Sequence, residues 1–179
     1  MRCIRVFITN GSLAAIKFKL DIKVPSAYAH VTMLQEVLTE DLVTTDLKAR
    51  TKNEVIVQML DMLCATGKVS DREAALQALM DNENRMSTGM EHGIAIPHAK
   101  TDSVDELLAC VGITKKKIDF ESLDRKPARI FIMTLSPKGR TGPHIRFLAE
   151  ISQLLKDEKR RKQVLACKTN AEMLSTLFG

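Results

Sequence analysis

Residues 93–98 read Gly-Ile-Ala-Ile-Pro-His, a short apolar run that ends in a proline and a histidine. Apolar runs of this length, bounded by Gly and Pro, are typical of buried strands. Pro97 fixes its own backbone dihedral and has no main-chain N–H, so a regular strand is interrupted there. We therefore expect this run to deliver His98 to the end of a sheet strand, where reactive side chains are common.

The segments around this run alternate between strand and helix patterns. The expected strands, which are apolar and mostly rich in β-branched residues, cover residues 42–47, 93–98, 106–114 and 128–135. The expected helices begin at Leu34, Thr51, Ser70, Pro143 and Thr169, three of them at S/T-x-x-E capping boxes. Turns are expected at residues 115–117 and 136–142. The alternation predicts an α/β sandwich whose sheet is largely buried.

The spacing of apolar residues predicts which face of each helix is buried. The helix after Thr51 should stop near Gly67. Its expected inward residues, together with those of the helices that begin at Ser70 and Pro143, are Val55, Ile56, Met59, Leu60, Leu63, Ala75, Leu76, Leu79, Met80, Ile145, Leu148, Ile151 and Leu155.

Composition and charge restrict the class of protein. The 179 residues suit one globular domain with room for an extension, and the formal net charge is +5. Residues 1–32 contribute +4 of that charge, and the run at 156–162 mixes both signs, which favours a solvated helix face over a nucleic-acid site. No apolar run approaches the roughly 18–20 residues that cross a bilayer. Four widely spaced cysteines, with no C-x-x-C pair, favour a reduced, cytoplasmic setting.

Residues 1–32 differ from the remainder of the chain. Residues 16–24 alternate apolar and polar side chains, and Asn10-Gly11 is a hairpin signal, so one interpretation is a β-hairpin arm. The other is an over-extended start, with Met33 as the natural first residue, and we favour an N-terminal extension of this kind followed by a domain at 33–179.

Two histidines have settings that suit phosphoryl chemistry. His98 ends the apolar run, and His144 follows Gly142-Pro143 at the first turn of an expected helix, where free N–H groups and the helix dipole attract anions. A neutral imidazole is nucleophilic near pH 7, although a strand-end histidine can also be purely structural. The candidate hydrogen-bond donors to a phosphoryl group are Thr88, Lys100, His144 and the backbone amides of residues 87–89. His92, His98 and His144 lack metal-ligand spacing, so we expect neither a metal nor a cofactor.

Residues 87–100 resemble the active-site signature of the fructose–mannitol type of enzyme IIA domain. These domains belong to the phosphoenolpyruvate-dependent sugar phosphotransferase system, and the nitrogen-regulatory IIA proteins share the signature. His144–Ala149, Ile118–Phe120 and Asp124–Ala128 are also similar to later family segments, in the expected order. The resemblance spans about residues 33–179. It implies a mixed central sheet flanked by helices, of the phosphotransferase/anion-transport type, with His98 as the phosphorylated residue and His144 beside it.

The chain departs from the family pattern at one position. The family usually has an arginine sixteen residues before the active histidine, in an Arg-Glu pair, and this chain has Asn82-Glu83. An amide can donate hydrogen bonds to phosphate but carries no charge, so the usual bidentate cation is lost. Arg85 lies one helical turn away and is our candidate substitute, which makes Asn82 and Arg85 the remaining predicted phosphate-binding residues.

The resemblance also implies partners. A small phosphodonor protein, HPr or its nitrogen-branch relative, would phosphorylate His98, and a separate IIB component would accept the group for sugar uptake. The identity of the sugar is not encoded, because IIA domains do not bind it. Two alternatives stay open: a regulator that binds target proteins according to its phosphorylation state, and a binding module whose phosphotransfer has decayed.

Overall fold

The computed structural model describes residues 32–179. The predicted N-terminal extension therefore lies, apart from Thr32, outside the described residues. The sheet is built around two long antiparallel strands, β4 (Leu108–Ile118) and β5 (Ala128–Ser136). The short strand β1 (Val43–Leu47) runs parallel to β4. β2 (Ile94–Ala95) and β3 (His98–Lys100) both run parallel to β5, which completes a five-stranded mixed sheet.

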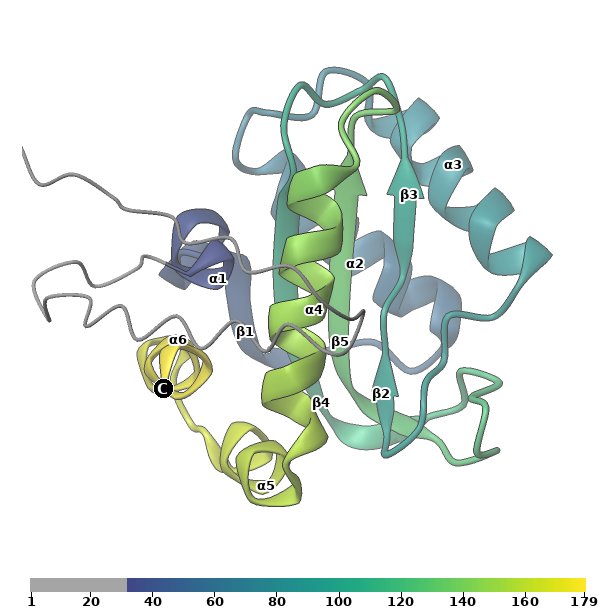
Figure 1. The fold of residues 1–179 in the computed structure, drawn as a ribbon. Helices are drawn as coiled ribbons and strands as arrows, with labels where there is room; N and C mark the ends of the chain where they lie inside the picture. The colour runs from purple at the N-terminus through teal and green to yellow at the C-terminus, as the bar shows by residue number, and fades with distance from the viewer. Residues whose placement is uncertain (1–31) are drawn as a thin grey trace, which may run out of the picture. The chain divides into compact units, whose positions relative to one another are not determined.

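Helices cover both faces of this sheet (Figure 1). α2 (Lys52–Cys64) and α3 (Arg72–Arg85) lie on one face, with α3 next to β3. α4 (Gly142–Lys156) crosses the other face. The remaining short elements pack towards the β1 side and are α1 (Met33–Val37), the 3₁₀ turn η1 (Glu40–Leu42), α5 (Glu158–Ala166) and α6 (Asn170–Phe178). The predicted α/β sandwich with a mixed central sheet is confirmed.

Apolar side chains from the sheet and from both helical layers form one core. Phe120, Phe131 and Phe147 are completely buried, and each contributes roughly 1.5–3 kcal/mol through removal of apolar surface from water. Phe120 and Phe131 lie with their ring centroids 5.5 Å apart, in a tilted arrangement that aromatic pairs favour. Since the chain has no tryptophan, phenylalanine supplies the largest core side chains.

Two of the five predicted helix starts, Thr51 and Thr169, are correct, and the other three are displaced by one residue. The Thr51 and Thr169 side chains accept hydrogen bonds from the backbone N–H groups of Glu54 and Glu172, which is half of each predicted capping box. The two glutamate side chains accept instead from the residue before the N-cap. The predicted start at Ser70 is wrong: Asp71 caps α3 instead and accepts from the N–H of Ala74. A carboxylate at this position also interacts favourably with the positive end of the helix dipole.

Two further expectations need correction. Residues 115–117 were expected to form a turn, but they continue β4, and an irregularity in its register with β5 between Ile113 and Ile118 accommodates them. Ile145 was expected to point inward but is 60% exposed. In α4 the inward positions are His144, Phe147, Ile151 and Leu155, because a histidine takes the place that the apolar pattern alone gives to Ile145.

The predicted strand at residues 93–98 forms an interrupted edge of the sheet. β2 and β3 keep one continuous register with β5, in which Ile94 lies opposite Ile130 and His98 lies opposite Thr134. Pro97 stands between them, and its carbonyl accepts a hydrogen bond from the Thr134 N–H. The ladder is interrupted here because Pro97 faces β5 with its carbonyl but has no N–H to donate to that strand.

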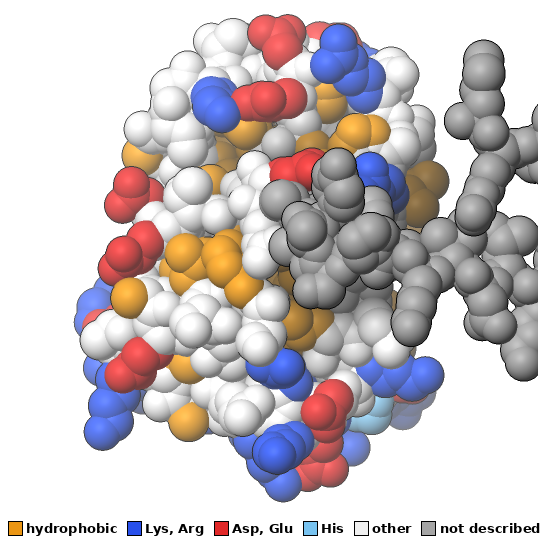
Figure 2. All heavy atoms as spheres, turned by 60° about the vertical axis from the view of Figure 1, so that its left-hand side comes forward, with side chains coloured by type: hydrophobic (Ala, Val, Ile, Leu, Met, Phe, Trp, Pro, Cys, Tyr) orange, Lys and Arg blue, Asp and Glu red, His pale blue; other side chains and the backbone are white. Residues whose placement is uncertain are grey.

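Charges of both signs are interspersed with apolar side chains on the face that Figure 2 shows. That face therefore carries no continuous basic surface of the kind that binds nucleic acid. Within residues 32–179, no helix combines the length and the apolar character needed to span a membrane.

Gly89 packs against the connection between β4 and β5, at residues 120–122. A Cβ atom at this position would lie 2.5 Å from the carbonyl oxygen of Phe120 and 2.7 Å from the Cα of Ser122. We expect Gly89→Ala to lower the free energy of unfolding by about 1–3 kcal/mol, because backbone must shift to admit the methyl group. Gly139→Ala, where no atom lies within 4 Å, is the matched control and should change it by less than about 0.5 kcal/mol. Equal denaturation midpoints for the two variants would contradict this packing.

Candidate active site

His98 is the first residue of β3 and is half-buried. Its Nδ1 atom lies 2.9 Å from the carbonyl oxygen of Ile96. A carbonyl oxygen can only accept, so Nδ1 must carry the hydrogen and donate it. In the neutral ring, the lone pair is then on Nε2. The backbone two residues upstream thus fixes both the orientation and the tautomer of this imidazole.

His144 lies in the first turn of α4 and is only 6% exposed. Its ring centroid is 5.8 Å from that of His98, with 42° between the ring planes. The preceding Pro143 occupies an early helical position, and the N-cap Thr141 makes no side-chain capping bond. The N–H groups of this helix end therefore remain available to an anion, as the sequence predicts.

The electrostatic setting of His144 favours its neutral form. Burial lowers the pKa of the His144 imidazole, and the nearby His98 ring and Lys100 ammonium lower it further. Lys100 lines the same pocket as His144, so its ammonium raises the positive potential there. Burial disfavours any charge at this position, whereas the Lys100 ammonium disfavours a cation and favours an incoming anion.

A pocket of about 430 Å³ brings most of the predicted site residues together. It is lined by Ala78, Asp81, Asn82, Arg85, His98, Ala99, Lys100 and His144. Three layers of the fold meet here, because α3, β3 and α4 each contribute side chains. Five of the six residues predicted for the site line this pocket; Thr88 does not.

Asn82 acts on the backbone of the active-site strand. Its Nδ2 atom donates a 2.9 Å hydrogen bond to the carbonyl oxygen of His98, which ties α3 to β3. Arg85 lies one turn further along α3, is exposed, and forms no ion pair with any residue between 32 and 179. Of the two predicted phosphate ligands on α3, the structure therefore gives Asn82 an intramolecular partner and leaves the guanidinium of Arg85 available.

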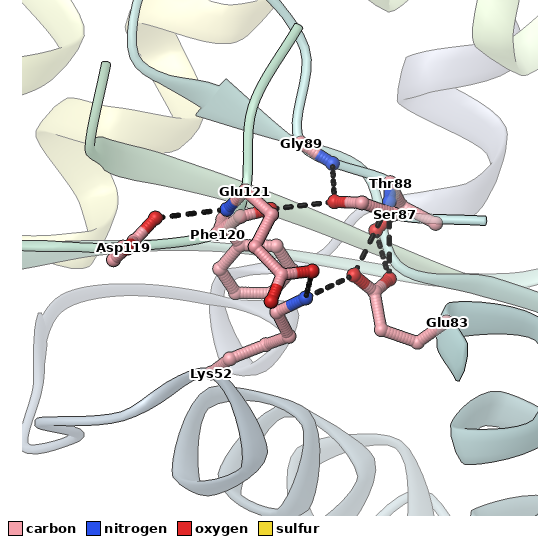
Figure 3. Close-up of polar contacts among 8 residues, drawn as sticks. All are labelled: Lys52, Glu83, Ser87, Thr88, Gly89, Asp119, Phe120 and Glu121. Carbon is pink, nitrogen blue, oxygen red and sulfur yellow. Dashed lines mark hydrogen bonds and ion pairs between the residues drawn. The ribbon is translucent and has the colours of Figure 1, made fainter. Parts of the chain in front are cut away.

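Thr88 is turned into a different network, which Figure 3 shows. Its hydroxyl donates to a carboxylate oxygen of Glu83 at 2.5 Å, and its backbone N–H donates to the same carboxylate at 3.2 Å. The neighbouring N–H of Gly89 donates to the Ser87 hydroxyl. The N–H groups of residues 88 and 89 thus already donate hydrogen bonds within the protein, and we assign this segment a structural role.

Glu83 is 6% exposed, and Lys52 on α2 is the cation that compensates its charge. The Lys52 ammonium lies 3.0 Å from Glu83 and 2.9 Å from Glu121, and it also stands over the Phe120 ring at 5.5 Å (Figure 3). Burial lowers the pKa of Lys52, but these two carboxylates outweigh burial and raise it overall. Glu83 is buried and Lys52 is partly exposed, and their ion pair links α2, α3 and the segment that contains Thr88.

The sequence prediction missed Asp81 on the pocket lining and Thr134 behind His144. Thr134 is completely buried in β5, and its hydroxyl lies 3.4 Å from Nδ1 of His144. The signal was its isolation as a polar side chain within the apolar run Ile130–Leu135, but only the strand register reveals that it lies opposite His98. No group of three or more His, Cys, Asp or Glu side chains between residues 32 and 179 is arranged to hold a metal ion.

One known protein family matches most of the chain. A family described as "Phosphoenolpyruvate-dependent sugar phosphotransferase system, EIIA 2" matches residues 36–178. The chain belongs to this EIIA family. Members act as phosphotransfer components of the sugar phosphotransferase system. The match confirms the predicted resemblance over almost the same residues.

Three relatives illustrate the range of the family. A fructose-specific EIIA component of Haloferax volcanii is 33% identical over 82% of this chain and 96% of its own length. A fructose-specific EIIABC component of Bacillus subtilis is 35% identical over 80% of this chain, which spans only 23% of that larger protein. A nitrogen regulatory protein of Bradyrhizobium diazoefficiens is 26% identical over 80% of this chain and 94% of its own length.

Solved structures share the fold. The nitrogen regulatory protein IIA-Ntr of Neisseria meningitidis superimposes with a TM-score of 0.70 at 22% identity, over 79% of this chain and 97% of that one. Enzyme IIA for mannitol of Escherichia coli, in a complex with its phosphorylated IIB enzyme, gives a TM-score of 0.69 at 24% identity, over the same shares of the two chains. At this identity the likeness establishes the fold alone.

The setting of His144 leads to a titration prediction. We expect His144 to be less than half protonated at pH 6.5, the ordinary pKa of the side chain, because burial and two positive neighbours disfavour the imidazolium. Lys100→Met should raise the pKa only partly towards that value, since burial is the larger cause. Imidazole NMR titration measures both effects, with the exposed Lys162→Met on α5 as a control that should change nothing. A wild-type His144 pKa of 6.5 or above would overturn this description.

Proposed function

We propose that the chain is a cytoplasmic phosphocarrier that accepts a phosphoryl group on Nε2 of His98 from an HPr-like donor protein and passes it to a IIB component. The observation that supports this most directly is the hydrogen bond from Nδ1 of His98 to the Ile96 carbonyl, which leaves the Nε2 lone pair as the nucleophile in a pocket with two cations. No cofactor is needed, because the donor supplies the phosphoryl group already activated.

The transfer is a displacement at phosphorus. The Nε2 lone pair of His98 forms a new N–P bond while the N–P bond of the donor's phosphohistidine breaks, and the donor imidazole leaves with that electron pair. His98 loses no proton, because Nδ1–H stays bonded to the Ile96 carbonyl. That hydrogen bond also stabilises the positive charge that the ring gains on phosphorylation.

The pocket supplies what a loose phosphoryl transition state needs, namely position and compensation of oxygen charge. Arg85 and Lys100 contribute full positive charges, and His144 with the first turn of α4 contributes N–H donors. Asn82 serves to hold the backbone of His98, so in this proposal Arg85 replaces the arginine that the family usually has at position 82.

The partner assignment draws on the relatives. One solved structure pairs a mannitol IIA enzyme with a phosphorylated IIB enzyme, and two relatives are fructose-specific components. We propose by analogy that a separate IIB component is the acceptor here, in the service of sugar uptake.

A regulatory role is the second candidate, favoured by the 26% identity to a nitrogen regulatory protein over 94% of that protein's length. Neighbouring genes for IIB and IIC components would support transport. Binding of another protein that differs between the phosphorylated and unphosphorylated chain, in the absence of such genes, would support regulation.

Phosphorylation at His98 is tested by intact mass after incubation with phosphoenolpyruvate, enzyme I and HPr. We expect one phosphoryl adduct in the wild type, none in His98→Ala, and a slower but complete reaction in His144→Ala. The loss of one donor to the transferring group corresponds to a rate reduction of about 10²–10³-fold. An adduct that persists in His98→Ala would reject the assigned acceptor, and absence of any adduct in the wild type would favour the decayed binding module.

Arg85 has its own test. We expect Arg85→Ala to slow phosphorylation of His98 by about 10–100-fold, the range that corresponds to one charge-assisted hydrogen bond. Arg50→Ala is the matched control, because Arg50 is also exposed but does not line the pocket. Equal rates for the two variants would show that Arg85 does not replace the missing family arginine.

A further inference from the structure

The His144 imidazole has one nitrogen directed to the protein interior. Nδ1 lies 3.4 Å from the hydroxyl oxygen of Thr134, the only hydrogen-bond partner of that hydroxyl among residues 32–179. Thr134 is completely buried in β5, so its hydroxyl has no access to bulk water. The donor in this hydrogen bond therefore determines the tautomer of His144: if the hydroxyl donates to Nδ1, the ring hydrogen of the neutral imidazole is on Nε2.

Only one arrangement satisfies both groups. If Nδ1 carried the hydrogen, it would donate to the Thr134 oxygen, and the hydroxyl hydrogen of Thr134 would be left buried without an acceptor, at a cost of about 1–3 kcal/mol. If the hydroxyl donates to Nδ1 instead, both atoms are satisfied and the ring hydrogen is on Nε2. A neutral imidazole, the form that burial favours for His144, allows only these two choices.

We propose that Thr134 is a positioning residue that fixes His144 as the Nε2–H tautomer, so that this ring donates a hydrogen bond to the phosphoryl group carried by His98. This proposal rests on the proposed phosphocarrier function for its consequence, but the tautomer itself is a property of the unphosphorylated chain.

The sheet register places the two determinants together. His98 and Thr134 are directly paired between β3 and β5, and α4 sets His144 beside them with 5.8 Å between the ring centroids. The protein thus fixes both rings through Nδ1, by the Ile96 carbonyl on one and by the Thr134 hydroxyl on the other. The carbonyl makes His98 a nucleophile at Nε2, and the hydroxyl makes His144 a donor at Nε2.

The tautomer can be measured directly on the full chain by ¹⁵N NMR of the histidine rings, without any phosphodonor. We expect a protonated, pyrrole-type signal for Nε2 and an unprotonated, pyridine-type signal for Nδ1 of His144. In Thr134→Val, which keeps the shape but removes the hydroxyl, the two tautomers should mix, and Thr134→Ser should restore the Nε2–H form. A wild-type His144 with its hydrogen on Nδ1, or an unchanged spectrum in Thr134→Val, would overturn the proposal.

A matched variant separates this effect from general destabilisation. Thr114→Val removes another buried strand hydroxyl, one that donates to the carbonyl of Lys116 outside the pocket. It should leave the His144 signals unchanged whatever it does to the melting temperature. If Thr114→Val mixed the tautomers as Thr134→Val does, the proposed specific contact would be rejected.

The phosphorylation rate gives the functional readout. Thr134→Val should slow phosphorylation of His98 by about tenfold, the equivalent of one ordinary hydrogen bond, and Thr134→Ser should stay within about threefold of the wild type. An unaltered rate in Thr134→Val would remove the functional part of the proposal. A wild-type chain with the Nε2–H tautomer but no phosphoryl adduct would instead refute the phosphocarrier function and leave the structural assignment of Thr134 intact.

Discussion

The hydrogen bond between the His98 ring and the Ile96 carbonyl depends on the edge position of this strand. The carbonyls of Gly93 and Pro97 accept hydrogen bonds from β5, whereas the Ile96 N–H donates away from β5, to the carbonyl of Thr88. The Ile96 carbonyl is therefore not used in the sheet ladder and is available to the imidazole two residues later. A central strand would have engaged this carbonyl, so the same sequence could not have fixed the ring in that way.

The remaining structure serves to hold this edge in place. Asn82 fixes the backbone of His98 from α3, while the Lys52–Glu83 pair fixes α3 and the segment that precedes the strand. These contacts are hydrogen bonds and an ion pair, and they are largely shielded from solvent. They restrict the orientation of the groups more closely than apolar contacts do. The site therefore combines a rigid backbone with a pocket whose cations stay free for an external anion.

The sequence was sufficient for the architecture and for both histidines. The strand that ends at Pro97 and the helix that begins at Pro143 carry strong local signals, and those signals place His98 and His144. The misassigned residues depend on nonlocal contacts. Thr88 is drawn from the pocket by the buried carboxylate of Glu83, and Ile145 is displaced outward by His144. Thr134 gains its partner, His144, only when α4 lies against β5. No periodicity within one element contains this information.

The interruption of this sheet edge also affects the tendency of the protein to aggregate at high concentration. Exposed sheet edges can template intermolecular strand pairing, the first step towards aggregation. This edge is divided into two strands of two and three residues, and on the outer side of β2 the backbone of Ile94 and Ile96 is already bonded to residues 88–90. At the opposite edge, α6 packs on β1. A strand from a second molecule would thus find little continuous backbone to pair with at the edge beside the reactive imidazole.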